Sequence, residues 1–289
     1  MAAAAVRVQG LSRPPTVGAS DASSLRALVT GATGGIGRAT CFALLDSARG
    51  RGRRLVIAAA ASKPGPALEA LVTELAAKGA DAFGLHADLA DAAACTGLVA
   101  QAVERCAGLD VLVSNAGIAR GAPLVALEPA EWDAVFAIDV RATWLLARAA
   151  HPALAHSRGA IVAVASISAL YPFPGLGAYS PAKAALVMLC RQLAQEWAAD
   201  GIRVNSVSPG LIRTPLTEPI YRDADVLRRR QEAVPLGRIG TPEDVARAIV
   251  HLAGPEAAYA TGIDLRLDGG LGDHVLATIP GLPRSPAPA

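Results

Sequence analysis

The chain has 289 residues, and 52% of them are hydrophobic, which is enough apolar material for one large α/β domain or two small ones. Its formal net charge of +2 gives no reason to expect a nucleic-acid or membrane partner, and no run of eighteen or more apolar residues indicates a membrane span. Four cysteines lie far apart without metal-ligand spacing, so we expect reduced thiols in a cytoplasmic protein and no metal site.

The two ends of the chain differ in composition from its middle. Residues 1–24 are of low complexity and have no acidic residue before Asp21, which favours a disordered or weakly ordered extension over a transit peptide. Residues 276–289 are rich in proline and are expected to form a loose tail. We therefore expect a single folded domain over residues 25–275.

Strand-like apolar runs alternate with helical patterns from residue 25 onward. This βαβ order is typical of an α/β fold, a Rossmann-type doubly wound parallel sheet, which binds ligands at the carboxyl ends of its strands. The expected strands are Leu25–Thr30, Arg54–Ala59, Asp81–His86, Val111–Asn115, Ala160–Ser166, Arg203–Ser208 and Ile263–Leu267.

A glycine-rich turn, Thr30-Gly-Ala-Thr-Gly-Gly-Ile-Gly37, follows the first expected strand and precedes a helical pattern. In a dinucleotide fingerprint the glycines let the backbone approach the pyrophosphate, and the helix N-terminus supplies unpaired N–H groups to it. The spacing is Gly-x-x-x-Gly-x-Gly, which taken alone could also be an ordinary tight turn. The candidate cofactor-binding residues in this loop are Gly31, Thr33, Gly35, Ile36 and Gly37.

The segment Tyr179-Ser-Pro-Ala-Lys183 can carry proton chemistry. Residues four apart share a helix face, so Tyr179 and Lys183 can point into one cleft. A nearby ammonium favours the phenolate and lowers the tyrosine pKa from its usual value of about 10, so the group can transfer a proton near neutral pH. Ser166, at the end of an apolar run, could bind the same substrate oxygen and stabilise charge that develops there. A tyrosine and a lysine can also share a helix face by chance. The presence of Ser166 and of the glycine loop favours the functional interpretation.

With these motifs in place, the chain resembles the short-chain dehydrogenase/reductase family from about Leu25 to Gly270. Further motifs that carry the resemblance are Asp88-Leu89, Ser114-Asn-Ala-Gly117, Asn205, Pro209-Gly210 with Thr214, and Asp268-Gly-Gly270. The resemblance implies an oxidoreductase that transfers a hydride between NAD(P)H and a ketone, a sugar or polyol, or a 3-oxoacyl group, with Tyr179 as proton donor or acceptor. It also implies cofactor contacts from Asp88, Leu89, Asn115, Ala116, Gly117, Tyr179, Lys183, Pro209, Gly210, Ile212 and Thr214.

One candidate catalytic residue, Asp139, departs from the family's pattern, which usually has an asparagine there that holds a water running toward the lysine. Asparagine both accepts and donates hydrogen bonds, whereas an ionised aspartate only accepts. Asp139 could keep the acceptor role and hold Lys183 protonated, or it could be a structural helix residue. It is also the residue that favours an alternative function, a catalytically silent NAD(P)-binding regulatory protein.

The end of the second strand bears on the choice between NAD and NADP. NAD users usually place an acid there for the ribose 2′-hydroxyl, and here Ala59 stands at the expected position. The lack of a carboxylate removes repulsion against a 2′-phosphate, for which Ser62, Lys63 and Arg38 are candidate partners. The glycine loop contains no arginine, which many NADP users of the family have. These observations favour NADP over NAD.

Residues 211–235 mix apolar side chains with several arginines. In the family this region forms a mobile flap over the substrate. Its apolar residues could line a substrate pocket together with Phe173, Leu176 and Trp144, or they could be the packed face of an ordinary amphipathic helix.

Two helical segments, Asp139–Ala155 and Ala182–Ala199, are apolar around much of their circumference. One side of such a helix would pack on the sheet and the other on a partner subunit. Family members that resemble this chain are often tetramers built on these helices, so we expect a homo-oligomer, either a tetramer or a dimer.

Overall fold

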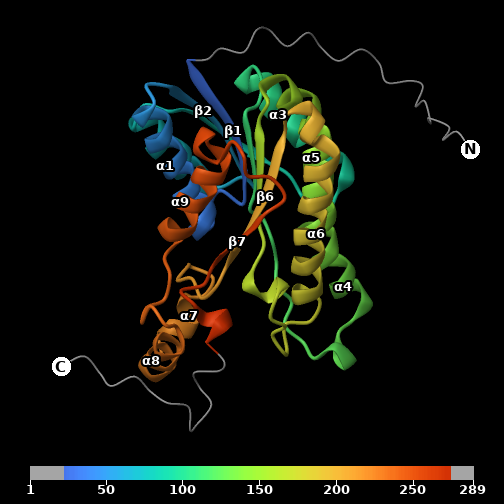
Figure 1. The fold of residues 1–289 in the computed structure, drawn as a ribbon, viewed down its shortest axis with the longest axis vertical. Helices are drawn as coiled ribbons and strands as arrows, with labels where there is room; N and C mark the ends of the chain where they lie inside the picture. The colour runs from blue at the N-terminus through green and yellow to red at the C-terminus, as the bar shows by residue number, and fades with distance from the viewer. Residues whose placement is uncertain (1–22, 275–289) are drawn as a thin grey trace, which may run out of the picture.

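The computed structural model describes residues 23–274, which build one parallel sheet with helices on both faces (Figure 1). The strands lie in the order β3-β2-β1-β4-β5-β6-β7. Their bounds are β1 Ser24–Thr30, β2 Arg54–Ala61, β3 Asp81–His86, β4 Val111–Ser114, β5 Ala160–Val164, β6 Arg203–Pro209 and β7 Asp264–Leu267. The helices are α1 Gly35–Gly50, α2 Pro66–Ala77, α3 Ala92–Cys106, α4 Pro129–Phe136, α5 Ala142–Ser157, α6 Tyr179–Trp197, α7 Glu218–Tyr221, α8 Ala224–Ala233 and α9 Pro242–Ala253.

The prediction of a Rossmann-type doubly wound sheet is confirmed, and each expected strand forms. Several strand ends differ from the expectation by one residue, and two differ by two residues. β2 continues to Ala61, and β5 ends at Val164, so that Ser166 lies just beyond the strand. The second difference has a local cause, because the Ser166 side chain caps a short 3₁₀ turn over Ile167–Ala169.

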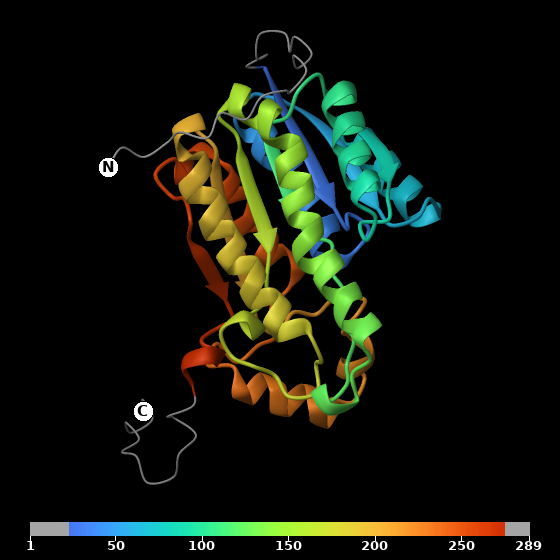
Figure 2. The ribbon, with the colours of Figure 1, turned by 90° about the vertical axis from the view of Figure 1, so that its right-hand side faces the viewer.

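Both faces of the sheet are buried, as continuous apolar strands require. Neighbouring residues of a strand point to opposite faces, so Leu28 packs in one apolar layer and Val29 in the other. Helices α3, α5 and α6 cover the first layer, and α1, α2 and α9 cover the second. In Figure 2, α5 and α6 stand in front of the sheet, and Figure 1 shows α1 and α9 on its opposite side.

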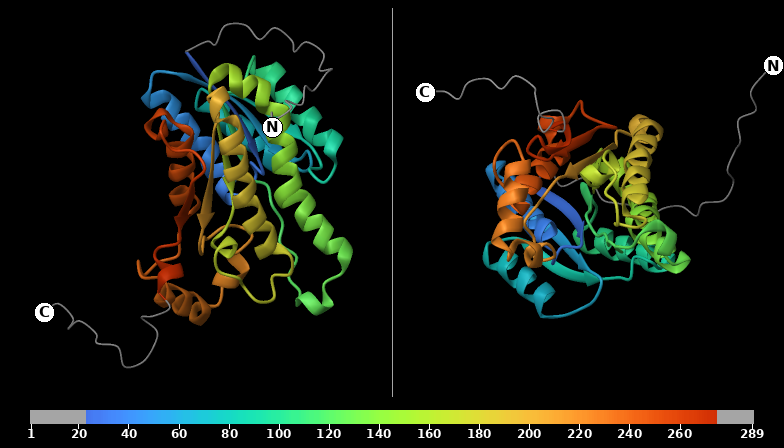
Figure 3. Two further views of the ribbon diagram at one scale, coloured as in Figure 1. Left: turned by 45° about the vertical axis from the view of Figure 1, so that its right-hand side comes forward. Right: turned by 90° about the horizontal axis from the view of Figure 1, so that it is seen from below.

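The strands run in one direction, so their carboxyl ends meet at one edge of the sheet. Helices α7 and α8 lie beyond this edge, as Figure 1 and the left view of Figure 3 show. Because ligands of such folds bind at the carboxyl ends of the strands, α7 and α8 are in position to cover a ligand.

The cysteines Cys41, Cys95, Cys106 and Cys190 are buried and free. Burial raises the pKa of Cys41, Cys106 and Cys190 to about 12, so these thiols stay protonated at neutral pH. Within residues 23–274, no helix combines the length and the apolar character that crossing a bilayer requires. The expectations for residues 1–22 and 275–289 lie outside the described part of the chain, and β1 begins at Ser24, one residue before the expected domain start.

Candidate active site

A cleft of about 680 Å³ opens at the carboxyl ends of the strands, within the size range of cofactor and small-molecule sites. Most of the residues proposed from the sequence line it. These are Gly31, Thr33, Gly35, Ile36, Asp88, Leu89, Asn115, Ala116, Gly117, Ser166, Tyr179, Lys183, Pro209, Gly210, Ile212 and Thr214. Two of the proposed residues, Gly37 and Asp139, do not line the cleft and lie behind residues that do.

The glycine loop between β1 and α1 is closely packed against its surroundings. A Cβ atom on Gly37 would lie 2.2 Å from the Gly31 carbonyl oxygen, so only glycine fits there. Asn115 Nδ2 donates to the carbonyl oxygens of Thr30 at 2.9 Å and Gly31 at 3.1 Å, which fixes the loop to the end of β4. Helix α1 has no side-chain cap at its N-terminus, which leaves backbone N–H groups for an anion. The loop therefore fits the pyrophosphate of a dinucleotide.

Thr30 joins the glycine loop to the segment after β4. Its hydroxyl oxygen accepts hydrogen bonds from the backbone N–H groups of Asn115 at 3.0 Å and Ala116 at 3.1 Å. The residue before Asn115 is Ser114, whose Oγ lies 2.8 Å from Thr143 Oγ1, and both side chains are buried. These contacts fix the positions of Asn115 and Ala116 on the cleft wall. Both residues were expected from the sequence to contact the cofactor.

Tyr179 is the first residue of α6, and Lys183 lies one turn further along the same face. Lys183 is 3% exposed, and its Nζ lies 5.5 Å from the centre of the Tyr179 ring. The ammonium donates to the Val164 carbonyl oxygen at 3.0 Å and lies 3.1 Å from Asp139 Oδ2. Burial alone would lower the pKa of Lys183, but its electrostatic interactions with Tyr179 and Asp139 outweigh burial and raise that pKa above its ordinary value. The lysine is therefore held protonated beneath the tyrosine.

Asp139 lies in a π-helical turn, Ala137–Arg141, between α4 and α5, and is 1% exposed. Its Oδ1 accepts a hydrogen bond from the Ile118 backbone N–H at 2.8 Å, and its Oδ2 faces Lys183. Turns of this kind are frequent at functional sites. The side chain thus combines the two alternatives from the sequence, since one oxygen holds the backbone after β4 and the other faces the lysine.

Ser166 leaves β5 in an extended conformation and lines the cleft beside the Tyr179 face. Its Oγ accepts a hydrogen bond from the Ser168 backbone N–H at 3.1 Å. The hydroxyl proton is not used in that bond, so it remains available for donation to a substrate oxygen.

Of the residues expected to meet NADP near the end of β2, only Ser62 lines the cleft. Ala59 is fully buried inside β2 and cannot meet the cofactor, because the strand continues and places Ala60, Ala61 and Ser62 on the cleft. Lys63 does not line the cleft. Arg38 also points elsewhere, since its guanidinium pairs with Glu74 at 2.6 Å on the outer surface.

The expected substrate pocket also differs from the structure. Phe173, Leu176 and Trp144 do not line the cleft, and Trp144 lies on the outer face of α5 instead. From the segment after β6, Leu216, Tyr221 and Arg230 line the cleft. The sequence located this segment but could not select Arg230, because α8 carries successive arginines with no pattern that distinguishes them.

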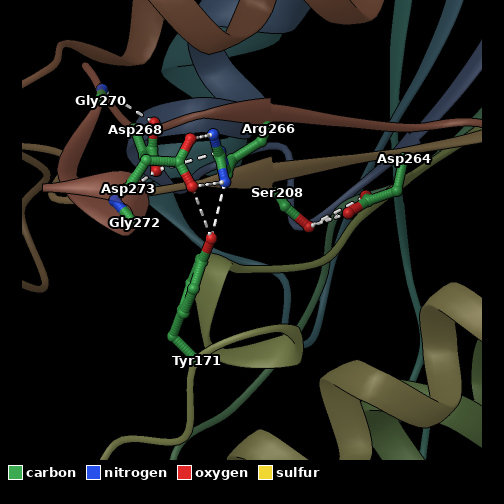
Figure 4. A network of polar contacts seen from close by, with 8 residues as sticks. All are labelled: Tyr171, Ser208, Asp264, Arg266, Asp268, Gly270, Gly272 and Asp273. Atoms are coloured by element: carbon green, nitrogen blue, oxygen red, sulfur yellow. Dashed lines mark hydrogen bonds and ion pairs between the residues drawn. The ribbon is translucent and has the colours of Figure 1, made fainter. Parts of the chain in front are cut away.

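A polar network that sequence analysis missed holds the loop after Ser166 (Figure 4). Arg266 Nη1 donates to the Tyr171 hydroxyl at 2.7 Å, and this hydroxyl donates to Asp273 Oδ1 at 3.1 Å. Arg266 also pairs with both Asp273 and Asp268, and Asp268 accepts from the backbone N–H of Gly272 at 2.9 Å. The network ties the loop between β5 and α6 to the segment after β7. Its partners are about a hundred residues apart in the chain, and no local pattern joins them.

Comparison with known proteins agrees with this geometry. A family model described as enoyl-(acyl carrier protein) reductase matches residues 31–272. A 3-oxoacyl-[acyl-carrier-protein] reductase of Synechocystis sp. is 35% identical over 247 residues, which cover 85% of this chain and 96% of that protein.

Two solved structures share the whole architecture. A protein of Sinorhizobium meliloti assigned as a short-chain alcohol dehydrogenase is 34% identical, with a TM-score of 0.79 over 88% of this chain and 97% of that one. A protein of Beutenbergia cavernae assigned as an NAD(P)-dependent gluconate 5-dehydrogenase, with bound NADP, is 31% identical, with a TM-score of 0.78 over 88% of this chain and 98% of that one. The chain therefore belongs to the short-chain dehydrogenase/reductase family of NAD(P)-dependent oxidoreductases.

Proposed function

We propose that the cleft interconverts a carbonyl group and a secondary alcohol, with Tyr179 as proton donor or acceptor. The observation that carries this proposal is the placement of a buried ammonium, Lys183, one turn beneath a tyrosine on the wall of a dinucleotide-sized cleft. A positive charge at this place favours a phenolate, so the tyrosine can give up and regain a proton.

The cofactor in this proposal is NADP, and its bound nicotinamide would supply or accept the hydride. The glycine loop would hold the pyrophosphate, as the packing of Gly31 and Gly37 leaves no room for side chains there. The cleft-lining residues at the end of β2 are Ala60, Ala61 and Ser62, none of which would repel a 2′-phosphate by charge. The NADP bound to the Beutenbergia cavernae relative supports the same choice.

Each catalytic candidate has a separate role. Ser166 would donate a hydrogen bond to the carbonyl oxygen, where negative charge develops during hydride transfer. Tyr179 would protonate that oxygen in reduction and take the proton back in oxidation. Lys183 would stabilise the phenolate through its charge, and Asp139 would keep the lysine charged and in place through its contact of 3.1 Å.

The substrate class is left at the level of a carbonyl or secondary alcohol. The relatives are named for a carrier-bound 3-oxoacyl group and for gluconate, and both contain this functional group. Since these names denote reductases and dehydrogenases, they give no support to the alternative of a catalytically silent protein.

The test of the proposal is NADPH and NADH oxidation by the purified protein across a panel of ketones, ketosugars and β-ketoacyl esters. We expect NADPH to be preferred and Tyr179→Phe to lower kcat by about 10²-fold or more, because the proton is then left without a donor. NADPH affinity of the Tyr179→Phe protein, measured by fluorescence titration, is the control and should change little. Tight NADPH binding with no turnover of any carbonyl would favour the silent alternative.

We further propose a homo-oligomer in the cytoplasm, assembled through α5 and α6. Trp144 on α5 is 41% exposed and Met188 on α6 is 59% exposed, on the side of these helices away from the sheet. The buried free thiols are compatible with a reducing compartment. A dimer or tetramer would remove these apolar side chains from water.

A further inference from the structure

The segment between β6 and α9 gives the cleft two polar side chains that the proposed proton chemistry does not use. Tyr221 ends α7 and Arg230 lies in α8, and both line the cleft. The two are in contact, with the Arg230 guanidinium carbon 5.7 Å from the centre of the Tyr221 ring. A guanidinium over an aromatic ring is attracted to its face, so the two side chains form one unit.

The Tyr221 hydroxyl has an unsatisfied hydrogen-bonding capacity. Tyr221 is 3% exposed, and its hydroxyl oxygen is buried without a hydrogen-bond partner among residues 23–274. A buried hydroxyl in this state is destabilising and is rare in folded proteins. A ligand that accepts a hydrogen bond within the cleft would supply the missing partner.

Among residues 23–274, Arg230 is the arginine of this segment that lines the cleft without a charge partner, whereas Arg222 and Arg229, which are also unpaired, are exposed and do not line it. Arg213 forms a bidentate pair with Glu218, at 2.9 and 2.7 Å, and Arg228 pairs with Glu232 at 2.9 Å. Arg230 makes no hydrogen bond or ion pair with any residue that the structure describes, and it is half-buried. An arginine kept in a cleft without a carboxylate partner is suited to bind an anion in two parallel hydrogen bonds.

The other charges that line the cleft also favour an anion at Arg230. Lys183 is compensated by Asp139, and the carboxylate that lines the cleft, Asp88, lies after β3. Arg230 therefore adds an uncompensated positive charge to this cleft. Since α7 and α8 follow β6, which lies next to β5 and far from β2 and β3 in the sheet, this charge is on the Ser166 side.

We propose that Arg230 and Tyr221 form an oxyanion subsite that binds a carboxylate or phosphate group carried by the carbonyl substrate. This inference rests on the proposed function and narrows the substrate class to anionic ketones and hydroxy compounds. The same chemistry could bind a phosphate of the dinucleotide, because the segment also approaches the glycine loop, where a Cβ on Gly35 would lie 3.1 Å from Thr214. The experiment separates these two sources.

The experiment uses calorimetric titration of the full chain saturated with NADP⁺, which cannot reduce a ketone, so binding is measured without turnover. The probes are matched pairs: acetoacetate with ethyl acetoacetate, 4-oxopentanoate with its ethyl ester, and dihydroxyacetone phosphate with dihydroxyacetone. The variants are Arg230→Met, Tyr221→Phe and the control Arg229→Met, which changes a neighbouring exposed arginine that does not line the cleft.

We expect the wild-type protein to bind at least one anionic probe more tightly than its neutral partner. Arg230→Met should weaken that probe by about tenfold or more, with the neutral probe, the NADPH affinity and the Arg229→Met control unchanged. Tyr221→Phe should weaken the same probe without lowering Tm, because its hydroxyl has no partner to lose. The proposal is overturned if no anionic probe is preferred, or if Arg230→Met weakens NADPH instead. Failure of the proposed function would look different, as an absence of turnover with binding preferences intact.

Discussion

Asp139 places a full negative charge 3.1 Å from the ammonium that lies beneath the proposed catalytic tyrosine. Such a pair is buried on both sides, with 4% of the lysine side chain and none of the aspartate side chain exposed. In a buried pair each charge depends on the other, because removal of one partner leaves an uncompensated charge in a medium of low polarity. The chemistry at Tyr179 should therefore respond to the charge of Asp139 and not only to its shape.

The prediction at this position is that Asp139→Asn shifts the pH–rate profile toward lower pH while activity persists. Without the carboxylate, the pKa of Lys183 loses both the charge and the hydrogen bond by which Asp139 raises it, so the ammonium is lost at a lower pH. The uncompensated ammonium would also stabilise negative charge on the Tyr179 oxygen more strongly, which favours proton acceptance in alcohol oxidation. The measurement is kcat against pH in the oxidative direction, for wild type and variant.

Asp139→Ala is the matched control for that experiment. Asparagine can still accept the Ile118 backbone hydrogen bond of 2.8 Å, whereas alanine cannot. Asp139→Ala should therefore lower Tm more than Asp139→Asn, and both should shift the profile. A profile that is unchanged in Asp139→Asn would show that the aspartate is only a structural residue of its π-helical turn.

At the scale of elements, α9 shows how a helix terminus is built from the sequence Thr241-Pro-Glu-Asp244. Thr241 Oγ1 accepts from the Asp244 backbone N–H at 3.3 Å, and Asp244 Oδ2 accepts from the Thr241 backbone N–H at 2.9 Å. This reciprocal arrangement satisfies two N–H groups that the helix leaves free. Asp244 also pairs with Arg238 at 2.6 Å and Arg247 at 2.7 Å. Helix α9 packs along α1, the helix that follows the glycine loop, so the cap at the start of α9 supports the packing of α1.

These contacts predict an acid-dependent contribution to stability. The hydrogen bond from Arg238 lowers the pKa of Asp244 to about 2, against about 3.9 in an unfolded chain. A carboxylate with a depressed pKa stabilises the fold above the unfolded pKa, and this contribution is lost as pH falls from about 4 toward 2. Asp244→Asn should cost about 1 kcal/mol near neutral pH, and the difference from wild type should shrink below about pH 4. Thermal unfolding of both proteins between pH 3 and 7 measures this.

Thr241→Ala separates the cap from the charge. It removes a neutral hydrogen-bond acceptor at the helix start, which typically costs about 1 kcal/mol. This loss should be nearly the same at each pH, since the threonine does not titrate. If the deficit of Asp244→Asn were equally independent of pH, the ionised form of Asp244 would contribute nothing beyond its neutral hydrogen bonds.

The elements that the sequence predicted are those whose cause is local. Buried parallel strands require apolar runs such as that of β1, and the loop from Gly31 to Gly37 needs glycines at fixed spacing, so both are visible in the chain. What the sequence missed depends on contacts between distant segments. The pairing of Tyr171 with Asp273 and the placement of Arg230 in the cleft depend on how the segments after β5 and after β7 and helix α8 are placed in the fold, and no local sequence pattern indicates that placement.

At the scale of the whole molecule, the outer side of α5 and α6 carries exposed apolar side chains that no contact within residues 23–274 explains. A hollow there is lined mainly by apolar residues, among them Phe136 of α4, Trp144 of α5 and Leu189 of α6, together with the charged Asp133 and Arg141. Met188, beside Leu189, is 59% exposed. Apolar side chains gathered in this way commonly mark a protein–protein contact, because their exposure to water is unfavourable.

The prediction at this scale is that the protein is a homo-oligomer and that Trp144→Glu dissociates it. A glutamate at this position would be buried in the interface without a partner, which costs several kcal/mol and would exceed what one contact can offset. The measurement is mass in solution by light scattering after size-exclusion chromatography, at micromolar protein. Tyr259→Glu is the matched control, since Tyr259 is a fully exposed aromatic residue in the connection before β7, and it should leave the mass unchanged.

The solution mass and the kcat of Trp144→Glu together show whether the assembly supports catalysis. The cleft is lined by residues of one chain, so a dissociated Trp144→Glu protein should still bind NADPH. α6, however, carries Tyr179 and Lys183 at one end and Met188 on its outer side, so loss of the partner would free the helix that positions the proton donor. We therefore expect a lower kcat with little change in NADPH affinity. A wild-type protein that is already monomeric, or a Trp144→Glu protein of unchanged mass, would place the subunit contact elsewhere or remove it altogether.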